Sequence, residues 1–201
     1  MRVLKTLFAA IFVLFLTLPV GAKTISTNSY STITHDPQVI KALDLMDGTT
    51  AEWAKKALLG SNDSGLPMII QFRDLSEISP DYANFDALGW KKGKQLYIYV
   101  NKKHQNAPPE ALASLLSHES VHQDEYCSLE EETYAWTYEA DVWTQMVAKN
   151  PDVAKIQCPL TERLNTLARL FKDSNYTSGK IRNVVYSNPG YKGLPVHSPG
   201  F

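Results

Sequence analysis

One short stretch of the sequence holds three side chains that could perform metal chemistry together: His118, Glu119 and His122, in the pattern His-Glu-x-x-His. Two histidines four residues apart lie one above the other on the same face of a helix, so both imidazoles can bind a single zinc ion. Glu119 then lies beside the ion rather than on it. There its carboxylate can accept a proton from a zinc-bound water, whose pKa the metal lowers toward neutrality.

A catalytic zinc site needs a third protein ligand, and an acidic cluster follows the motif closely. Glu130 falls on the polar stripe of the helix expected to begin at Ser128, which predicts a solvated carboxylate. Glu132 falls on the opposite stripe, which must be buried, where a carboxylate is costly unless it is paired or bound to a metal. Glu132 is therefore the predicted third ligand. Glu131 is the alternative, although its distance from Ser128 is also that of a capping box.

Other polar residues near the motif carry weaker signals. Glu139 lies on the same stripe as Glu132, two turns later, where it would either orient a ligating histidine or remain a partly exposed charge. Asp124 and Glu125 are predicted to be solvated, and His104 is predicted to lie on the surface. A donor for a developing oxyanion is also needed. The candidates, none of which is singled out by its spacing, are Tyr134, Tyr186, Tyr191 and His197.

The motif and its downstream glutamate resemble the gluzincin branch of zinc metallopeptidases, in which a helix bearing His-Glu-x-x-His is followed by a glutamate ligand on the next helix. The resemblance runs from the strand before the motif to residue 135. It implies that His118, His122 and Glu132 bind zinc, and that Glu119 acts as a general base. It also implies a zincin-like fold.

Two details bear on this resemblance. Ala135 stands three residues after Glu132, as an alanine does after the ligand glutamate in several such families. The nine residues between His122 and Glu132 form a shorter interval than in most gluzincins, which keeps Glu131 open as the third ligand. The metzincin branch is not matched, because a glycine and a third histidine do not follow His122 at the required spacing.

The elements that would position these residues follow from the apolar periodicity of the sequence. Helices are predicted over residues 37–47, 50–60, 109–122, 128–147 and 160–171. Strands are predicted over residues 66–72 and 95–100, with further possible strands at 85–90 and 181–186. The predicted fold class is α/β (α+β), with a small mixed sheet followed by the motif helix and further helices. By the resemblance, residues 95–100 form the edge strand that lines the cleft and pairs with a peptide.

The N-terminal residues have the pattern of a secretory signal peptide. Arg2 and Lys5 precede an apolar run over residues 7–18, and small residues stand at the −3 and −1 positions of a cleavage site after Ala22. Residues 1–22 are therefore predicted to be a signal peptide, and residues 23–201 a single secreted or periplasmic domain. The apolar run is shorter than the about 20 residues of a transmembrane helix, so we expect no stable membrane insertion after cleavage. An uncleaved N-terminal anchor is the alternative.

The two cysteines of the chain, Cys127 and Cys158, lie in the exported part. Thiols tend to pair in an oxidising compartment, so we predict a single disulfide between them. Two unpaired thiols, or a thiolate that binds a metal, are the alternatives. If formed, the disulfide would fix the turn between the two metal-bearing helices.

Charge excludes one class of partner. Lys and Arg number 20 and Asp and Glu number 21, and removal of the two basic residues of the signal leaves 18 − 21 = −3. No basic run marks a nucleic-acid surface. The sequence thus predicts an exported zinc-dependent peptidase that acts on a peptide or protein substrate. The alternative is an exported zinc-binding or protein-interaction module without catalytic activity.

Overall fold

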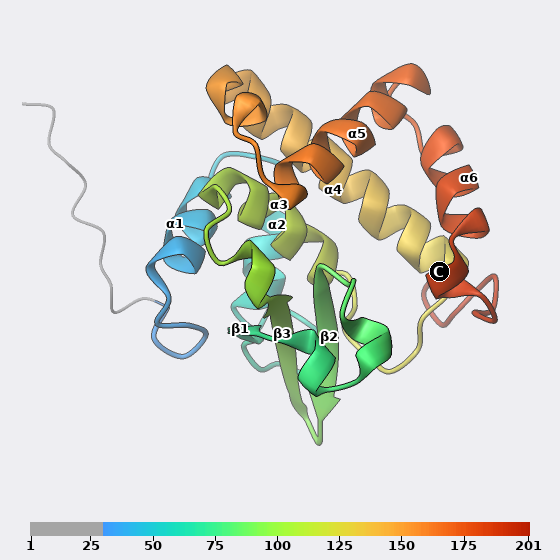
Figure 1. The fold of residues 1–201 in the computed structure, drawn as a ribbon. Helices are drawn as coiled ribbons and strands as arrows, with labels where there is room; N and C mark the ends of the chain where they lie inside the picture. The colour runs from blue at the N-terminus through green and yellow to red at the C-terminus, as the bar shows by residue number, and fades with distance from the viewer. Residues whose placement is uncertain (1–29) are drawn as a thin grey trace, which may run out of the picture.

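The computed structural model describes residues 30–201, so the predicted signal peptide at residues 1–22 lies outside the described residues. Within this range the chain forms a small sheet and six helices (Figure 1). The helices are α1 (Pro37–Leu45), α2 (Glu52–Leu58), α3 (Pro109–Glu119), α4 (Leu129–Lys149), α5 (Pro159–Asp173) and α6 (Gly179–Ser187). The strands are β1 (Ile69–Arg73), β2 (Ala87–Lys92) and β3 (Gln95–Asn101). The predicted mixed α/β class is confirmed.

The sheet is mixed and has the strand order β1-β3-β2. β1 runs parallel to β3, and β2 runs antiparallel to it. Leu96, Ile98 and Val100 alternate along β3 and are buried, because successive side chains of a strand point to opposite faces and one face is covered by helices. The structure thus confirms the two predicted strands and the possible strand at 85–90, although β1 begins at Ile69 instead of residue 66 and β2 begins at Ala87 instead of residue 85.

The prediction that residues 95–100 form an edge strand is wrong. β2 and β3 are joined by a tight turn whose Gly93 has a φ of +62°, a backbone conformation that favours glycine. This hairpin places β2 on one side of β3, and β1 pairs with the other side. The free edge nearest the motif helix therefore belongs to β2, which contacts α3.

Helix α3 lies between the sheet and the long helix α4, at the centre of the molecule (Figure 1). Leu112, Leu115 and Leu116 of α3 are buried in one cluster with Ile98 of the sheet and Trp143 of α4. Burial of leucine side chains is the main source of stability for such a core, at about 1.5–3 kcal/mol for each. The motif at the end of α3 is thus attached to a rigid part of the fold.

The C-terminal part of the chain packs against the other side of α4. The possible strand at 181–186 is wrong, because these residues lie in α6. Ile181 and Val185 stand four residues apart, on one helix face, and both are fully buried with Leu167 and Phe171. A contact that requires helical spacing therefore overrides the β propensity of this segment.

The last ten residues continue from this helical layer to the start of α4. Ser128 caps the helix, as predicted, by accepting a hydrogen bond from Glu131 N at 3.2 Å. Two further N–H groups of the first turn donate to tail carbonyls: Leu129 N to Pro195 O at 2.9 Å, and Glu130 N to Val196 O at 3.1 Å. These donors have no partner within a helix, so the tail stabilises the end of α4 that carries the acidic cluster.

The predicted disulfide is not formed, and both cysteines are free thiols. Cys127 precedes α4 and its Sγ donates to Glu132 Oε1 at 3.3 Å, whereas Cys158 occupies the position before α5 and its Sγ lies 3.0 Å from Thr161 Oγ1. The 21-residue helix α4 separates the two positions along the chain, and at about 1.5 Å per residue it spans about 30 Å. A disulfide needs Cα atoms within about 7 Å, so this helix keeps the sulfurs from meeting.

Across residues 30–201, no helix combines the length and the apolar character needed to cross a membrane.

Candidate metal site

The two motif histidines come from the last turn of α3 and the tighter turn that follows it. The predicted helix over residues 109–122 is too long by three residues, since α3 ends at Glu119. Val121 N donates to His118 O at 3.0 Å, and His122 N donates to Glu119 O at 3.3 Å. These i to i−3 bonds continue the helical path in a tighter form. His122 consequently still lies next to His118, with ring centroids 5.2 Å apart.

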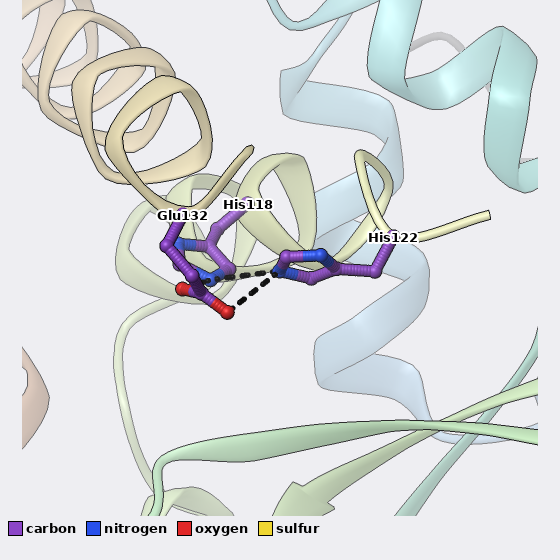
Figure 2. A group of neighbouring side chains, drawn as sticks. All are labelled: His118, His122 and Glu132. Atoms are coloured by element: carbon purple, nitrogen blue, oxygen red, sulfur yellow. Dashed lines mark hydrogen bonds and ion pairs between the residues drawn. The ribbon is translucent and has the colours of Figure 1, made fainter. Parts of the chain in front are cut away.

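His118, His122 and Glu132 form a group whose ligand atoms could hold a metal ion. The two Nε2 atoms are 3.3 Å apart, and Glu132 brings one carboxylate oxygen within 3.7 Å of each histidine (Figure 2). In a tetrahedral zinc site with Zn–N bonds of about 2.0–2.1 Å, the donor atoms lie about 3.3 Å apart. The spacing of these three groups therefore suits a metal ion.

The outer nitrogens of both histidines face carboxylates of α4. His122 Nδ1 lies 2.8 Å from Glu131 Oε1, and His118 Nδ1 lies 3.3 Å from Glu139 Oε2. Such contacts hold the ring in the orientation and tautomer that leaves Nε2 free for a metal. Glu139 thus contacts a histidine, as one reading of the sequence expected. Glu131 contacts the outer side of His122 instead of joining the group of three.

Charge is the strongest sign that this group fits a cation. The buried acidic residues among residues 30–201, Glu119, Glu131, Glu132 and Glu139, all surround the two histidines. Burial disfavours a charged imidazole, but the carboxylates of Glu131, Glu132 and Glu119 outweigh it and raise the pKa of His122 to about 9. Glu132 Oε2 is buried and has no hydrogen-bond partner. A buried anion is costly without a counter-ion, and a divalent cation would neutralise this one.

Glu119 lies at the boundary between α3 and the edge strand β2. Burial, together with the charges of Glu132 and Glu139, raises the pKa of Glu119 above that of an ordinary glutamate, in spite of the two histidines. Across from it, Gly89 is exposed, and a Cβ at this position would lie 3.9 Å from Glu119 Oε2 and 3.7 Å from His122 Cβ. The glycine therefore places no side chain of its own over Glu119 at this point of the exposed strand.

Of the four candidate oxyanion donors, only Tyr191 lies by Glu132 and Glu119. Its hydroxyl accepts a hydrogen bond from Trp136 Nε1 at 2.9 Å, and burial together with the neighbouring Glu132 carboxylate raises its pKa. Tyr191 therefore stays protonated and remains a donor at neutral pH. The other three are exposed: Tyr134 stacks on other surface rings, Tyr186 is bonded to Glu130, and His197 is in the tail.

The sequence did not predict the polar network that lies behind His118. Glu139, the partner of His118, is held by Arg163 of α5, and the same guanidinium lies 2.7 Å from Asp86 Oδ2. Asp86 Oδ1 in turn lies 2.6 Å from His104 Nε2, and His104 is buried instead of exposed as predicted. These residues are far apart in the sequence and lie on different elements. Their spacing therefore gives no sign that they meet.

Asp86 offers a direct test of this network. Burial alone would raise the pKa of Asp86. The hydrogen bond from His104 and the charge of Arg163 lower the pKa by more than burial raises it, so it lies well below the ordinary 3.8. A carboxyl with a lowered pKa stabilises the fold above about pH 4, and this stabilisation is lost as the pH falls through the folded-state pKa. Asp86→Asn is thus expected to reduce the free energy of unfolding at pH 7 by about 2 kcal/mol.

The measurement is urea unfolding of both proteins at pH 7 and pH 3, with a chelator present so that no metal contributes. The difference between them should shrink at pH 3, where Asp86 of the wild type becomes protonated during unfolding. Equal stabilities at pH 7 would contradict a stabilising role for the Asp86 contacts.

The chain was compared with protein-family models, with curated proteins and with solved structures, and none of the three comparisons found a match.

Proposed function

We propose that this protein is an exported zinc-dependent peptidase with a zincin-like arrangement of its motif helix, its downstream glutamate and its edge strand. The observation that carries the proposal is the group of His118, His122 and Glu132 at zinc-site spacing, with the buried carboxylate of Glu119 beside it. A structural zinc site has four protein ligands, whereas a catalytic site has three and an open position. Among the described residues, no fourth His, Cys, Asp or Glu donor belongs to this group.

Cys127 bears on the choice between these two kinds of site. A thiolate in the fourth position would favour a structural zinc and hence the alternative of a binding module. The Cys127 sulfur instead falls in a separate group with His122 and Glu131. It donates to Glu132 Oε1, and burial with the charge of Glu132 raises its pKa well above that of an ordinary thiol. Cys127 therefore supports Glu132 as a hydrogen-bond donor.

The chemistry divides between the bound ion and the chain's own residues. A zinc ion, when bound, polarises a peptide carbonyl and lowers the pKa of a water molecule beside it. Glu119 accepts the proton of the attacking water on its carboxylate, then delivers a proton to the leaving amine. The raised pKa of Glu119 brings it closer to neutral pH, which suits both steps. Tyr191, protonated and beside Glu132, is the residue best placed to donate to the developing oxyanion.

The substrate would lie extended along the free edge of β2. An edge strand presents unpaired backbone N–H and C=O groups, which can bind a peptide main chain with little demand on its sequence. Gly89 of β2 leaves the scissile bond room to approach Glu119. The proposed substrate class is therefore an extended peptide or an unfolded segment of a protein.

Chelation tests this function. We expect the purified protein to hydrolyse a fluorescently labelled casein, to lose this activity on treatment with a chelator, and to regain it when zinc is restored. A serine-protease inhibitor serves as the control for contamination. A protein that binds zinc tightly but cleaves neither casein nor a mixed peptide library would contradict the proposal and favour the zinc-binding module.

A further inference from the structure

Arg163 is the centre of the network behind the metal site, although it contacts no candidate ligand. Its Nη1 donates to Glu139 Oε2 at 3.1 Å, and its Nη2 donates to Glu139 Oε1. A guanidinium that binds both oxygens of a carboxylate fixes the plane of that group as well as its position. Its Nε lies 2.7 Å from Asp86 Oδ2, and its guanidinium carbon lies over the Trp136 ring, 5.8 Å from the ring centroid. Arg163 is therefore held on three sides.

Glu139 is the group through which Arg163 reaches the metal site. Glu139 is fully buried, and its Oε2 atom both accepts from Arg163 and lies 3.3 Å from His118 Nδ1. A free carboxylate of this kind could rotate away from the imidazole, or draw water into the core. With Arg163 on both oxygens, one oxygen remains directed at His118.

The other side of Arg163 reaches the edge strand. Asp86 immediately precedes β2, and its backbone carbonyl accepts from Asn101 N at 2.8 Å. The series His118, Glu139, Arg163 and Asp86 thus joins the metal-binding end of α3 to the first residue before β2. These two elements form opposite sides of the proposed site.

We propose that Arg163 is a positioning residue of the metal site, which holds Glu139 on His118 Nδ1 and thereby sets the affinity for zinc. This inference rests on the proposed zinc site. Replacing a direct partner of a metal-binding histidine typically weakens metal affinity by 10–100-fold. Arg163 is one contact further from the metal, so we expect Arg163→Met to weaken zinc binding by about 10-fold.

The experiment measures the dissociation constant for zinc by competition with a chromophoric chelator, for the full chain and its variants. Arg182→Met is the matched control, because Arg182 also pairs with a glutamate of α4, Glu130, but on the exposed face. It should change the affinity less than twofold. Arg163→Lys keeps the charge but cannot bind both oxygens in the same planar manner, and should give an intermediate loss. If Arg163→Met does not fold, the zinc affinity of Arg163→Lys tests the proposal instead.

A double-mutant cycle with Glu139→Gln separates positioning from a general loss of stability. If Arg163 acts through Glu139, Arg163→Met should cost about 10-fold in the wild-type background and less than about threefold in the Glu139→Gln background. Loss of the same size in both backgrounds would overturn the proposal, as would unchanged zinc affinity in Arg163→Met or in Arg163→Lys. Failure of the wild type to bind zinc would instead overturn the proposed function.

Discussion

Glu119→Gln is expected to reduce peptide hydrolysis by at least about 1,000-fold and to leave zinc binding intact. General acid–base catalysis contributes about 10²–10⁴-fold, and Glu119 would serve in both steps of the reaction. An amide has the same shape as the carboxylate but cannot accept the proton of the attacking water. Because Glu119 does not belong to the group of three candidate ligands, zinc should remain bound.

The measurements are the rate of casein cleavage and the zinc content of the same samples. Glu125→Gln is the matched control: Glu125 lies in the turn after the motif, is exposed and pairs with Lys91, so this variant should keep its activity. Full activity of Glu119→Gln would contradict the assignment of the general base. Loss of both zinc and activity would instead indicate that Glu119 binds the metal.

Glu132→Ala is expected to weaken zinc binding by more than about 100-fold. Removing an outer partner of a ligand weakens metal affinity by up to about 100-fold, and removing a ligand itself should cost more. The reason is that Glu132 offers an oxygen to each histidine, within 3.7 Å of both Nε2 atoms. Zinc stabilises the folded protein in proportion to the logarithm of its affinity. A 100-fold loss of affinity therefore removes about 2.7 kcal/mol of zinc-dependent stabilisation.

Comparison with the two neighbouring glutamates shows whether the third ligand is correctly assigned. Glu131→Ala removes the partner of His122 Nδ1 and should weaken binding by about 10–100-fold, less than Glu132→Ala. Glu130→Ala, which removes an ion pair with Arg182 on the outer face, should have little effect. Thermal unfolding with and without zinc measures all three. A larger effect from Glu131 than from Glu132 would contradict the assignment.

The sequence predicts well those features of the fold that depend only on nearby residues. The first helix, the three strands, and the Ser128 cap are each set by residues within a few positions, and the structure confirms them. Burial of Glu132 followed from its place on the apolar stripe of α4. The distance between His122 and Glu132 could not be predicted in this way, because the turn of residues 120–128 sets it.

Features that depend on how elements pack were missed. His104 was predicted to be exposed, because a lone histidine after a strand has no visible partner in the sequence. It is buried because Asp86, 18 residues away, meets it through the hairpin of β2 and β3. Arg163 likewise lies 24 residues from Glu139 on another helix. The pairing of the cysteines was wrong for the same reason, since the length of α4 keeps them on different parts of the fold.

The metal content of the purified, dialysed protein is the most direct test of the proposed site. Elemental mass spectrometry should find about one zinc ion per chain in the wild type, and well below one in a variant with both His118→Ala and His122→Ala. Circular dichroism of each sample would verify that the protein is folded. A folded wild-type protein that contains no zinc, and takes up none when zinc is supplied, would contradict the account.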